Sequence, residues 1–228
     1  MEDGKSMNKL NILYEDNHII VVEKMPNILS QSDITKDMDL LTMVKSYIKE
    51  RYNKPGNVYL GLVHRLDRPV GGLMVFAKTS KAAKRLSEQI KKHQFDKYYL
   101  AIVNGVLKED GVLEDKLKKL DNGNTIVSDD GKESILNYKV LEVNKSNNMT
   151  LVKVNLITGR HHQIRVQFAS RGYPLVGDQR YGKQDKKQIC LYAYKLEFIH
   201  PTTKEKLKFI KLPTKKGSWT LFTMSKNV

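Results

Sequence analysis

Four ionisable side chains lie within one short stretch, Gly61–Gly72, which reads GLVHRLDRPVGG. They belong to His64, Arg65, Asp67 and Arg68. Asp67 is the one carboxylate, and the guanidinium groups on either side of it in the sequence would keep it ionised at neutral pH. An ionised carboxylate in a basic pocket suits attack on an anionic substrate, or removal of a proton from it. The same residues also fit a surface loop with a local Arg–Asp pair, and charge pattern alone leaves both interpretations open.

The residues around this stretch predict two strands that would hold it at the edge of a sheet. An apolar run, Val58–Val63 with Gly61 inside it, comes before the charged residues, and a second run, Leu73–Ala77, comes after them. Pro69 and the two glycines between the runs predict a turn. Strand, charged loop, turn and strand is an arrangement that positions a polar group rigidly at the end of a sheet.

A second cluster, KYYLA at 97–101, lies at the start of a predicted strand over 95–103. A tyrosine here could pack in the core, lie on the surface or stack on a nucleobase, and stacking contributes roughly 1–3 kcal/mol when the ring is held still. Tyr98 and Tyr99 point to opposite faces because side chains alternate along a strand. On their own, these residues favour core packing.

A third cluster, TGRHHQIRVQF at 158–168, opens a predicted helix over 161–171. His161 and His162 would point to different sides of that helix, and no further ligand falls at metal-binding spacing, so the pattern argues against a metal site. Arg165 follows Ile164, which lines the inner side of the helix. A buried arginine needs an anion as its partner, and we expect Asp67 to be that anion.

The composition favours a folded protein with an anionic partner. The 228 residues are 40% hydrophobic, and 40 Lys and Arg against 25 Asp and Glu give a net charge of +15. That balance favours a polyanion such as a nucleic acid as the partner, although it is a weak signal alone.

The single cysteine, Cys190, excludes a disulfide framework and a thiolate metal cluster, and its apolar neighbours place it in the core. No apolar stretch reaches the roughly 18 residues of a membrane span, and the N-terminus has no signal-peptide core, so we expect a cytoplasmic protein.

The remaining patterns predict one α+β domain over residues 10–228, preceded by a flexible segment, 1–9. Two more helices are expected, one over 39–52 and one that begins at a cap formed by Thr79 or Ser80. Alternating apolar residues predict a hairpin of 135–143 and 149–157, whereas 105–131 shows the least periodicity. Further strands are expected as a pair within 10–23 and at 190–199, 207–212 and 219–222. The fold class is therefore a mixed, mostly antiparallel sheet flanked by helices, and the lack of a long apolar or heptad surface favours a monomer.

Together the three clusters resemble the motifs of the pseudouridine synthases, specifically the family of the ribosomal large-subunit synthase A type. The match comprises HRLDR at 64–68, YLA at 99–101 with a basic residue before it, and TGRHHQIR at 158–165, in the family's order. The opening LYEDNHIIVVEKMP at 13–26 and the pattern G-x-P-x-x-G-D-x-x-Y-G at 172–182 also resemble the family. Two departures, Pro69–Gly72 in place of Thr-Ser-Gly and Gln167 in place of a frequent histidine, remove no residue that the chemistry requires.

The resemblance implies an enzyme that isomerises uridine to pseudouridine in structured RNA, ribosomal or transfer, without a cofactor or metal. Asp67 would attack C1′ of the ribose or remove a ribose proton. Arg165 would form a salt bridge to Asp67, Tyr99 would stack on the uracil and could later take a proton from it, and Arg65 would contact the RNA backbone near the flipped nucleotide. The residues of 172–182 would shape a loop. Exposed lysines of the second helix and of 116–119 would contact phosphates, and no accessory RNA-binding domain is expected before residue 12.

Two other classes of protein stay open. A non-catalytic RNA-binding protein would share the positive charge and the aromatic residue but would not need an aspartate against two arginines. A glycosidase or nucleoside hydrolase usually works with two carboxylates, and no second acid stands beside Asp67 in these motifs.

Overall fold

The computed structural model describes residues 10–225, so the expected flexible segment, 1–9, lies outside the described residues. The helices are α1 (Leu40–Arg51), α2 (Ser80–Lys91) and α3 (Gln163–Ala169), with a 3-10 helix at Gly217–Leu221. The strands are β1 (Asn11–Glu15), β2 (Ile19–Lys24), β3 (Gly61–Leu62), β4 (Gly71–Ala77), β5 (Phe95–Asn104), β6 (Gly111–Lys119), β7 (Thr125–Val127), β8 (Lys132–Asn144), β9 (Met149–Leu156), β10 (Leu191–Ile199) and β11 (Lys206–Ile210). No helix in the described range is long and apolar enough to cross a membrane.

The strands of the described residues form one sheet in the order β1-β2-β4-β10-β5-β9-β8-β6-β7, with β3 beside β4 and β11 beside β10. All pairings between these strands are antiparallel except that of β4 with β10, which joins Gly71 to Tyr192 and Gly72 to Ala193. Gly72 has φ +129°, and a Cβ there would lie 2.4 Å from the carbonyl oxygen of Ala193, so only glycine permits this close approach. The predicted mixed, mostly antiparallel sheet is confirmed.

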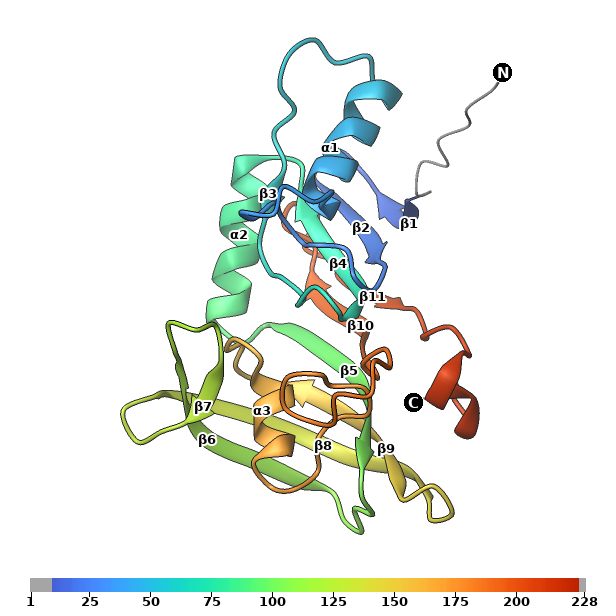
Figure 1. The fold of residues 1–228 in the computed structure, drawn as a ribbon. Coiled ribbons are helices and arrows are strands. Elements are labelled where there is room, and N and C mark those ends of the chain that lie inside the picture. Colours follow the sequence, from blue (N-terminus) through green and yellow to red (C-terminus); the bar gives the residue numbers. More distant parts are fainter. Residues whose placement is uncertain (1–9, 226–228) are drawn as a thin grey trace, which may run out of the picture.

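Helices pack on both faces of this sheet. Apolar residues of α1 and α3, among them Val44, Ile164 and Phe168, share one buried cluster with the residues of β2, β4 and β5 that point to that face. Leu86 of α2 packs on the other face. In Figure 1, α1 and α2 lie beside β1, β2 and β4, whereas α3 lies beside β6 to β9. We call residues 10–91 the N-terminal half and residues 95–210 the C-terminal half, and the pairing of β4 with β10 joins them.

Side-chain caps explain where the first two helices begin. Asp39 Oδ1 accepts a hydrogen bond from the backbone N–H of Thr42 at 2.9 Å. Thr79 Oγ1 accepts one from the N–H of Ala82 at 3.2 Å, which shows that Thr79, rather than Ser80, caps α2. Such a cap contributes about 1 kcal/mol because it satisfies an N–H group that has no partner within the helix.

One predicted element is wrong, one is shorter than expected, and two strands were not predicted. The stretch 105–131, whose periodicity is weak, contains β6 and β7. Its alternation is hard to recognise because Asp115 stands between the buried Leu113 and Leu117. The carboxylate of Asp115 accepts a hydrogen bond from the amide of Gln167. The residues at 219–222, predicted as a strand, belong largely to the 3-10 helix, whose Trp219 packs against the sheet. The strand expected at 58–63 is reduced to β3.

Candidate active site

Asp67 lies on the loop between β3 and β4, and buried contacts to the main chain fix that loop. Ser30 Oγ donates to the carbonyl oxygen of Leu66 at 2.7 Å and accepts from the Leu66 N–H at 3.1 Å. The Lys24 side chain, which is 0% exposed, donates from Nζ to the carbonyl oxygen of Arg68 at 3.0 Å. Both residues flanking Asp67 are therefore tethered, so the carboxylate stands on a backbone with little freedom.

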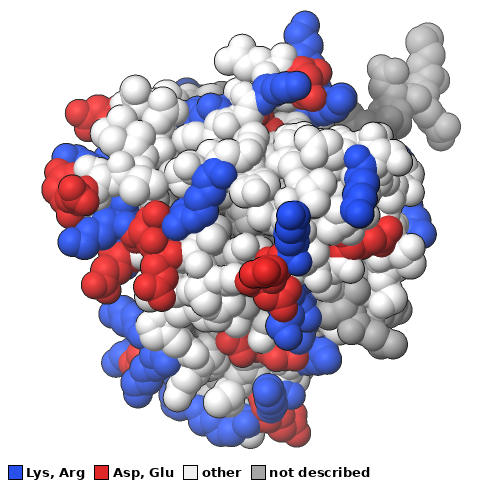
Figure 2. Space-filling model, turned by 90° about the horizontal axis from the view of Figure 1, so that it is seen from below, with Lys and Arg blue, Asp and Glu red and all other residues white. Residues whose placement is uncertain are grey.

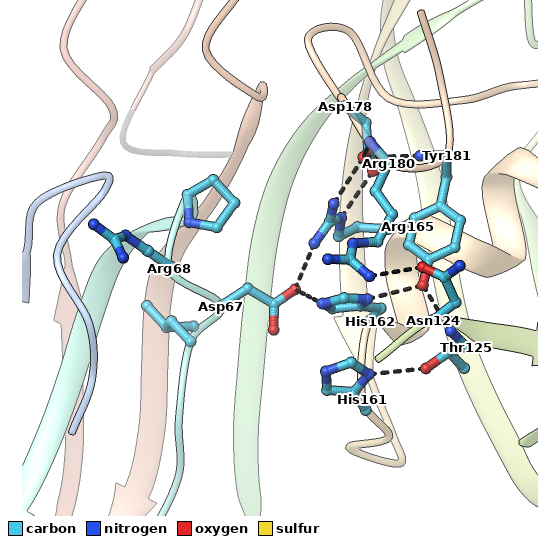
Figure 3. Close-up of polar contacts among 12 residues, drawn as sticks. Asp67, Arg68, Asn124, Thr125, His161, His162, Arg165, Asp178, Arg180 and Tyr181 are labelled. Atoms are coloured by element: carbon cyan, nitrogen blue, oxygen red, sulfur yellow. Dashed lines mark hydrogen bonds and ion pairs between the residues drawn. The ribbon is translucent and has the colours of Figure 1, made fainter. Parts of the chain in front are cut away.

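Residues of the C-terminal half meet Asp67 across the loop. Arg165 Nη1 lies 3.2 Å from Asp67 Oδ2, and His162 Nε2 lies 3.6 Å from the same oxygen. Figure 3 shows both side chains pointing at the carboxylate. The Asp67 side chain keeps 27% of its surface exposed, so it remains accessible to a substrate. The contact between Arg165 and Asp67 that the sequence suggested is present.

The two arginines that neighbour Asp67 in the sequence are not its ion-pair partners. Arg68 points away from Asp67 in Figure 3, and its Nη2 lies 2.7 Å from Asp37 Oδ2. Arg65 is exposed and, within residues 10–225, forms no ion pair with Asp67. Arg68 belongs to the turn that follows the loop, and its side chain reaches Asp37, so the distant Arg165 supplies the positive charge beside Asp67.

Arg165 is buried and fixed by a second carboxylate. Its Nε and Nη2 donate to the two oxygens of Asp178 at 2.8 and 2.7 Å, which leaves Nη1 for Asp67. Burial disfavours the charge on Arg165, but the hydrogen bonds and charge of Asp178, with those of Asp67, raise its pKa overall. Burial likewise opposes the charge on Asp178, yet hydrogen bonds from Arg165 and from the backbone of Arg180 and Tyr181 lower its pKa. Asp178 therefore does more than shape a loop, because its two hydrogen bonds orient Arg165 towards Asp67.

His161 and His162 precede α3, and the expectation that they point to different sides of a helix is wrong. His162 has a left-handed backbone with φ 53° and ψ 22°, and the two rings stack with their centroids 3.7 Å apart. The hydroxyl of Tyr181 lies 2.8 Å from both His162 Nδ1 and the backbone nitrogen of Thr125. This arrangement fits the tautomer in which Nδ1 accepts from the hydroxyl and Nε2, 3.6 Å from Asp67 Oδ2, carries the ring proton. Burial lowers the pKa of His162 to about 4, so the ring is neutral at pH 7.

Sequence reasoning missed three residues of this site, namely His162, Asp178 and Tyr181. Each lies inside a motif that was already recognised, at 158–165 or 172–182. Their position in those motifs was the available signal. Their residue types alone did not distinguish a role in the site from a role in the loop.

Tyr99, Arg65 and Ile164 line an open cleft of about 1750 Å³ beside Asp67. Tyr99 is 6% exposed, and burial together with the nearby Asp67 raises its pKa. Tyr98 lies on the other face of β5, where Lys195 Nζ stands 4.3 Å from its ring centroid, so the alternation predicted for the two tyrosines is confirmed. A pocket for one small ligand rarely exceeds roughly 1000 Å³, so this cleft suits a segment of a polymer.

Basic side chains outnumber acidic ones along the cleft. Its lining includes the cations of Arg65, Arg68, Lys91, Lys97, Lys119, Arg160, Arg165, Arg180, Lys186 and Lys187. The carboxylates of the lining are those of Asp33, Asp67 and Asp96. On the face shown in Figure 2, Lys and Arg lie interspersed with Asp and Glu around uncharged surface. Excess positive charge therefore gathers where a polyanion would reach Asp67.

His64, the first ionisable residue of the opening motif, serves the fold. Its Nε2 accepts a hydrogen bond from the N–H of Val75 at 3.1 Å, and burial lowers its pKa to about 3, so the ring is neutral. Across the described part of the chain, no group of three or more His, Cys, Asp or Glu side chains is placed to hold a metal ion. Cys190 is buried and free, as its apolar neighbours predicted.

Comparison with known proteins places this geometry in one family. Residues 18–170 match the model of the RNA pseudouridylate synthases. An uncharacterized RNA pseudouridine synthase of Aquifex aeolicus (strain VF5) is 35% identical over 228 residues, which cover 93% of this chain and 68% of the relative. The ribosomal large subunit pseudouridine synthase D of Pseudomonas aeruginosa is 33% identical over 220 residues, which cover 88% of this chain and 67% of the relative.

A solved structure agrees with these matches at the level of the fold. Human RNA pseudouridylate synthase domain containing 1 superposes with a TM-score of 0.75 at 24% identity, over 96% of this chain and 89% of that one. The family match includes Asp67, Tyr99 and Arg165, and the two bacterial relatives are similar to nearly the whole chain. The resemblance seen in the three clusters is thereby confirmed: the chain belongs to the RNA pseudouridylate synthase family and is an RNA pseudouridine synthase.

Proposed function

We propose that this enzyme converts uridine to pseudouridine in large-subunit ribosomal RNA, with Asp67 as the catalytic carboxylate. The observation that carries the assignment is the placement of Asp67, which is accessible in a basic cleft and paired with one nitrogen of a guanidinium that Asp178 fixes. The name of the Pseudomonas relative favours large-subunit ribosomal RNA over transfer RNA as the substrate.

Asp67 would act in its ionised form on either of two routes. In one it attacks C1′ of the ribose while the bond from C1′ to N1 breaks, and in the other it removes a ribose proton to release the base. The freed uracil then turns, and its C5 forms the new bond to C1′ as the bond from Asp67 to C1′ breaks on the first route, or as the ribose regains its proton on the second. C5 then loses its proton to solvent, and N1 takes one up. Arg165 Nη1 supports both routes because its positive charge lies 3.2 Å from Asp67 Oδ2 and orients the carboxylate.

Tyr99 would provide a stacking surface for the uracil. Its ring is held in the wall of the cleft, on the same side of the sheet as Asp67. Because burial and the charge of Asp67 raise its pKa, the hydroxyl stays protonated at neutral pH. A protonated phenol is a poor base, so these surroundings favour stacking over the proton removal that was also considered for Tyr99.

Arg65 and Ile164 complete the proposed site. Arg65 is exposed at the cleft, where it would contact the RNA backbone and help to keep the target nucleotide out of its helix, which costs a few kcal/mol of unstacking. Ile164 lines the cleft beside Arg165 with an apolar side chain that would keep water from the freed base.

We also propose that residues 10–228 form the catalytic domain and that it acts as a monomer in the cytoplasm, without a metal or cofactor. The packing of Trp219 and Phe222 against the same sheet as β5 supports the inclusion of the C-terminal segment. The isomerisation moves a bond within one nucleotide and needs neither an oxidant nor a second substrate, which supports the absence of a cofactor.

Tritium release from RNA labelled at C5 of uracil tests the proposal. Wild-type enzyme, Asp67→Asn and the control Asp33→Asn, which removes another carboxylate of the cleft, would each be incubated with purified large-subunit ribosomal RNA and with transfer RNA. We expect release from the ribosomal RNA by the wild type and by Asp33→Asn, and none by Asp67→Asn. Turnover by Asp67→Asn would overturn the role of Asp67. Free uracil would indicate a hydrolase, and salt-sensitive RNA binding without release would indicate a binding protein.

A further inference from the structure

Lys97 is a buried cation that the proposed chemistry does not use. Its side chain lines the cleft that contains Asp67, yet the residue is only 8% exposed. It lies on β5 two residues before Tyr99, so both side chains point to the same face of the strand. The charged end therefore reaches the cleft from within the wall of the site rather than from its rim.

No carboxylate neutralises Lys97. Among residues 10–225, its Nζ forms neither an ion pair nor a hydrogen bond with any group, including the adjacent Asp96, which also lines the cleft. Burial lowers the pKa of the amine, and no neighbouring charge offsets that effect. Lysine is rarely buried without a partner, because removal of an ammonium from water is costly unless an anion receives it. The partner of Lys97 is therefore expected to come from outside the chain.

Gly159 keeps the space in front of Lys97 open. A Cβ at position 159 would stand 3.4 Å from Lys97 Nζ, so any other residue would project a side chain towards the ammonium. The backbone of Gly159 does not have the positive φ that would itself call for glycine. A residue without a side chain between Thr158 and Arg160 leaves access to Lys97, and the exposed Arg160 adds a second positive charge beside the opening.

We propose that Lys97 and Gly159 form a subsite for one backbone phosphate at the target nucleotide. The inference rests on the proposed stacking of the uracil on Tyr99. Two residues along a strand separate side chains by roughly 7 Å, a span that a nucleotide bridges between its base and its phosphate. With the base on Tyr99, a phosphate at Lys97 would fix both ends of the nucleotide, and Asp67 would face the sugar between them.

The test compares Lys97→Met with wild type in steady-state pseudouridine formation, with Lys91→Met as the matched control. Lys91 also lines the cleft but is exposed, so its loss removes one positive charge without removing a buried contact. We expect kcat/KM to fall roughly tenfold to a hundredfold for Lys97→Met, as for a charged hydrogen bond in a desolvated site, and less than about threefold for Lys91→Met.

Thermal unfolding separates a binding role from a structural one. Lys97→Met should unfold at or above the temperature of the wild type, because it replaces an unpaired buried charge with an apolar chain of similar length. A lower unfolding temperature for Lys97→Met would assign the lysine to the fold and overturn the subsite. An inactive wild type would instead refute the proposed function, whereas an active wild type with equal effects of the Lys97 and Lys91 variants would refute only the subsite.

Substrates with one neutral phosphate identify the contact. Once the target uridine is mapped, short RNAs would carry a single methylphosphonate on its 5′ or its 3′ side. At the phosphate that Lys97 binds, the neutral group should slow the wild type roughly tenfold and leave Lys97→Met nearly unchanged. Equal slowing of both enzymes at both positions would contradict the proposal.

Discussion

The two residues of the central ion pair are held in place by different means. In the N-terminal half, Asp67 is positioned by neutral groups of the main chain, which Ser30 and the buried Lys24 bind on either side of it. In the C-terminal half, Arg165 is positioned by charge, since Asp178 takes two of its donors. The proposed catalytic carboxylate thus has a fixed position and stays accessible, while its partner Arg165 has a fixed charge and stays buried.

This difference predicts which kind of substitution will affect each half of the protein most. A carboxylate that must reach a substrate cannot be enclosed by tight ion pairs, so its backbone has to hold it. An arginine that only orients the carboxylate can be enclosed, and a bidentate carboxylate is the strongest available partner for it. Loss of charge should therefore damage the C-terminal half most, whereas the N-terminal half should respond to changes in its buried tethers.

Asp178→Asn should have the largest effect of the changes that test this comparison. It leaves the buried Arg165 without its bidentate partner, which should cost about 3–5 kcal/mol in the free energy of unfolding. Arg165 would also no longer be oriented towards Asp67, and a displacement of a catalytic group by about 1 Å can lower kcat a hundredfold. Chemical denaturation and steady-state kinetics measure the two effects.

The pH dependence of unfolding provides the control for Asp178. Its pKa is lower in the folded protein than in the unfolded chain, so the pair stabilises the fold above the unfolded value of about 4 and the stabilisation disappears as the pH falls below it. The difference between wild type and Asp178→Asn should shrink over that range. A difference that stays constant down to pH 2 would mean that charge does not hold Arg165.

Lys24→Met tests the tether in the other half, with a smaller effect. The variant leaves the carbonyl oxygens of Ile28 and Arg68 without their donor, which should cost about 1–3 kcal/mol and lower kcat by shifting the loop of Asp67. Burial lowers the pKa of Lys24 to about 7, and the nearby charge of Asp67 offsets only part of that decrease. At pH 7 the buried amine of wild-type enzyme should therefore be about half protonated.

The pH range of the effect distinguishes Lys24 from Asp178, because both groups make the free energy of unfolding rise with pH, Asp178 below about pH 4 and Lys24 above about pH 7. Between pH 7 and about 10.4 the unfolded chain binds more protons at Lys24 than the folded protein does, so the free energy of unfolding should rise with pH, by up to about 1.4 kcal/mol per unit. Lys24→Met should lack this rise. An equal rise in both proteins would show that Lys24 is not the group that titrates.

Sequence reasoning recovered the parts of the site that depend on local pattern. The strand and loop around Asp67, the outward Tyr98 and inward Tyr99, and the approach of Arg165 to Asp67 all follow from alternation, turn residues and recognised motifs. Contacts between distant segments were not recoverable in the same way. The turn of Arg68 towards Asp37 and the pairing of Asp178 with Arg165 depend on tertiary packing, which no local pattern encodes.

Tyr181→Phe should have a smaller effect than the changes at the ion pair. It removes the hydroxyl that links Thr125 to His162 Nδ1, so the neutral ring is no longer restricted to the tautomer with its proton towards Asp67. Of the two hydrogen bonds lost, the one to His162 affects the site and contributes about 1 kcal/mol, so kcat should fall roughly fivefold to tenfold while RNA binding stays the same. Tyr173→Phe is the control, since the Tyr173 hydroxyl bonds no other described residue. Equal kcat values for the two variants would remove His162 from the site.

Arg68→Gln should have the smallest effect, and it tests the sequence-based expectation directly. Its ion pair with Asp37 is exposed, with 47% and 50% of the two side chains accessible, so its loss should change the free energy of unfolding by less than about 1 kcal/mol. At saturating RNA, kcat should stay within about twofold of wild type, because Arg165 rather than Arg68 faces Asp67. A tenfold fall in kcat would mean that the adjacent guanidinium does act on the carboxylate during turnover. In that case the Asp67 loop would have to rearrange when RNA binds, and main-chain tethering would not suffice to position it.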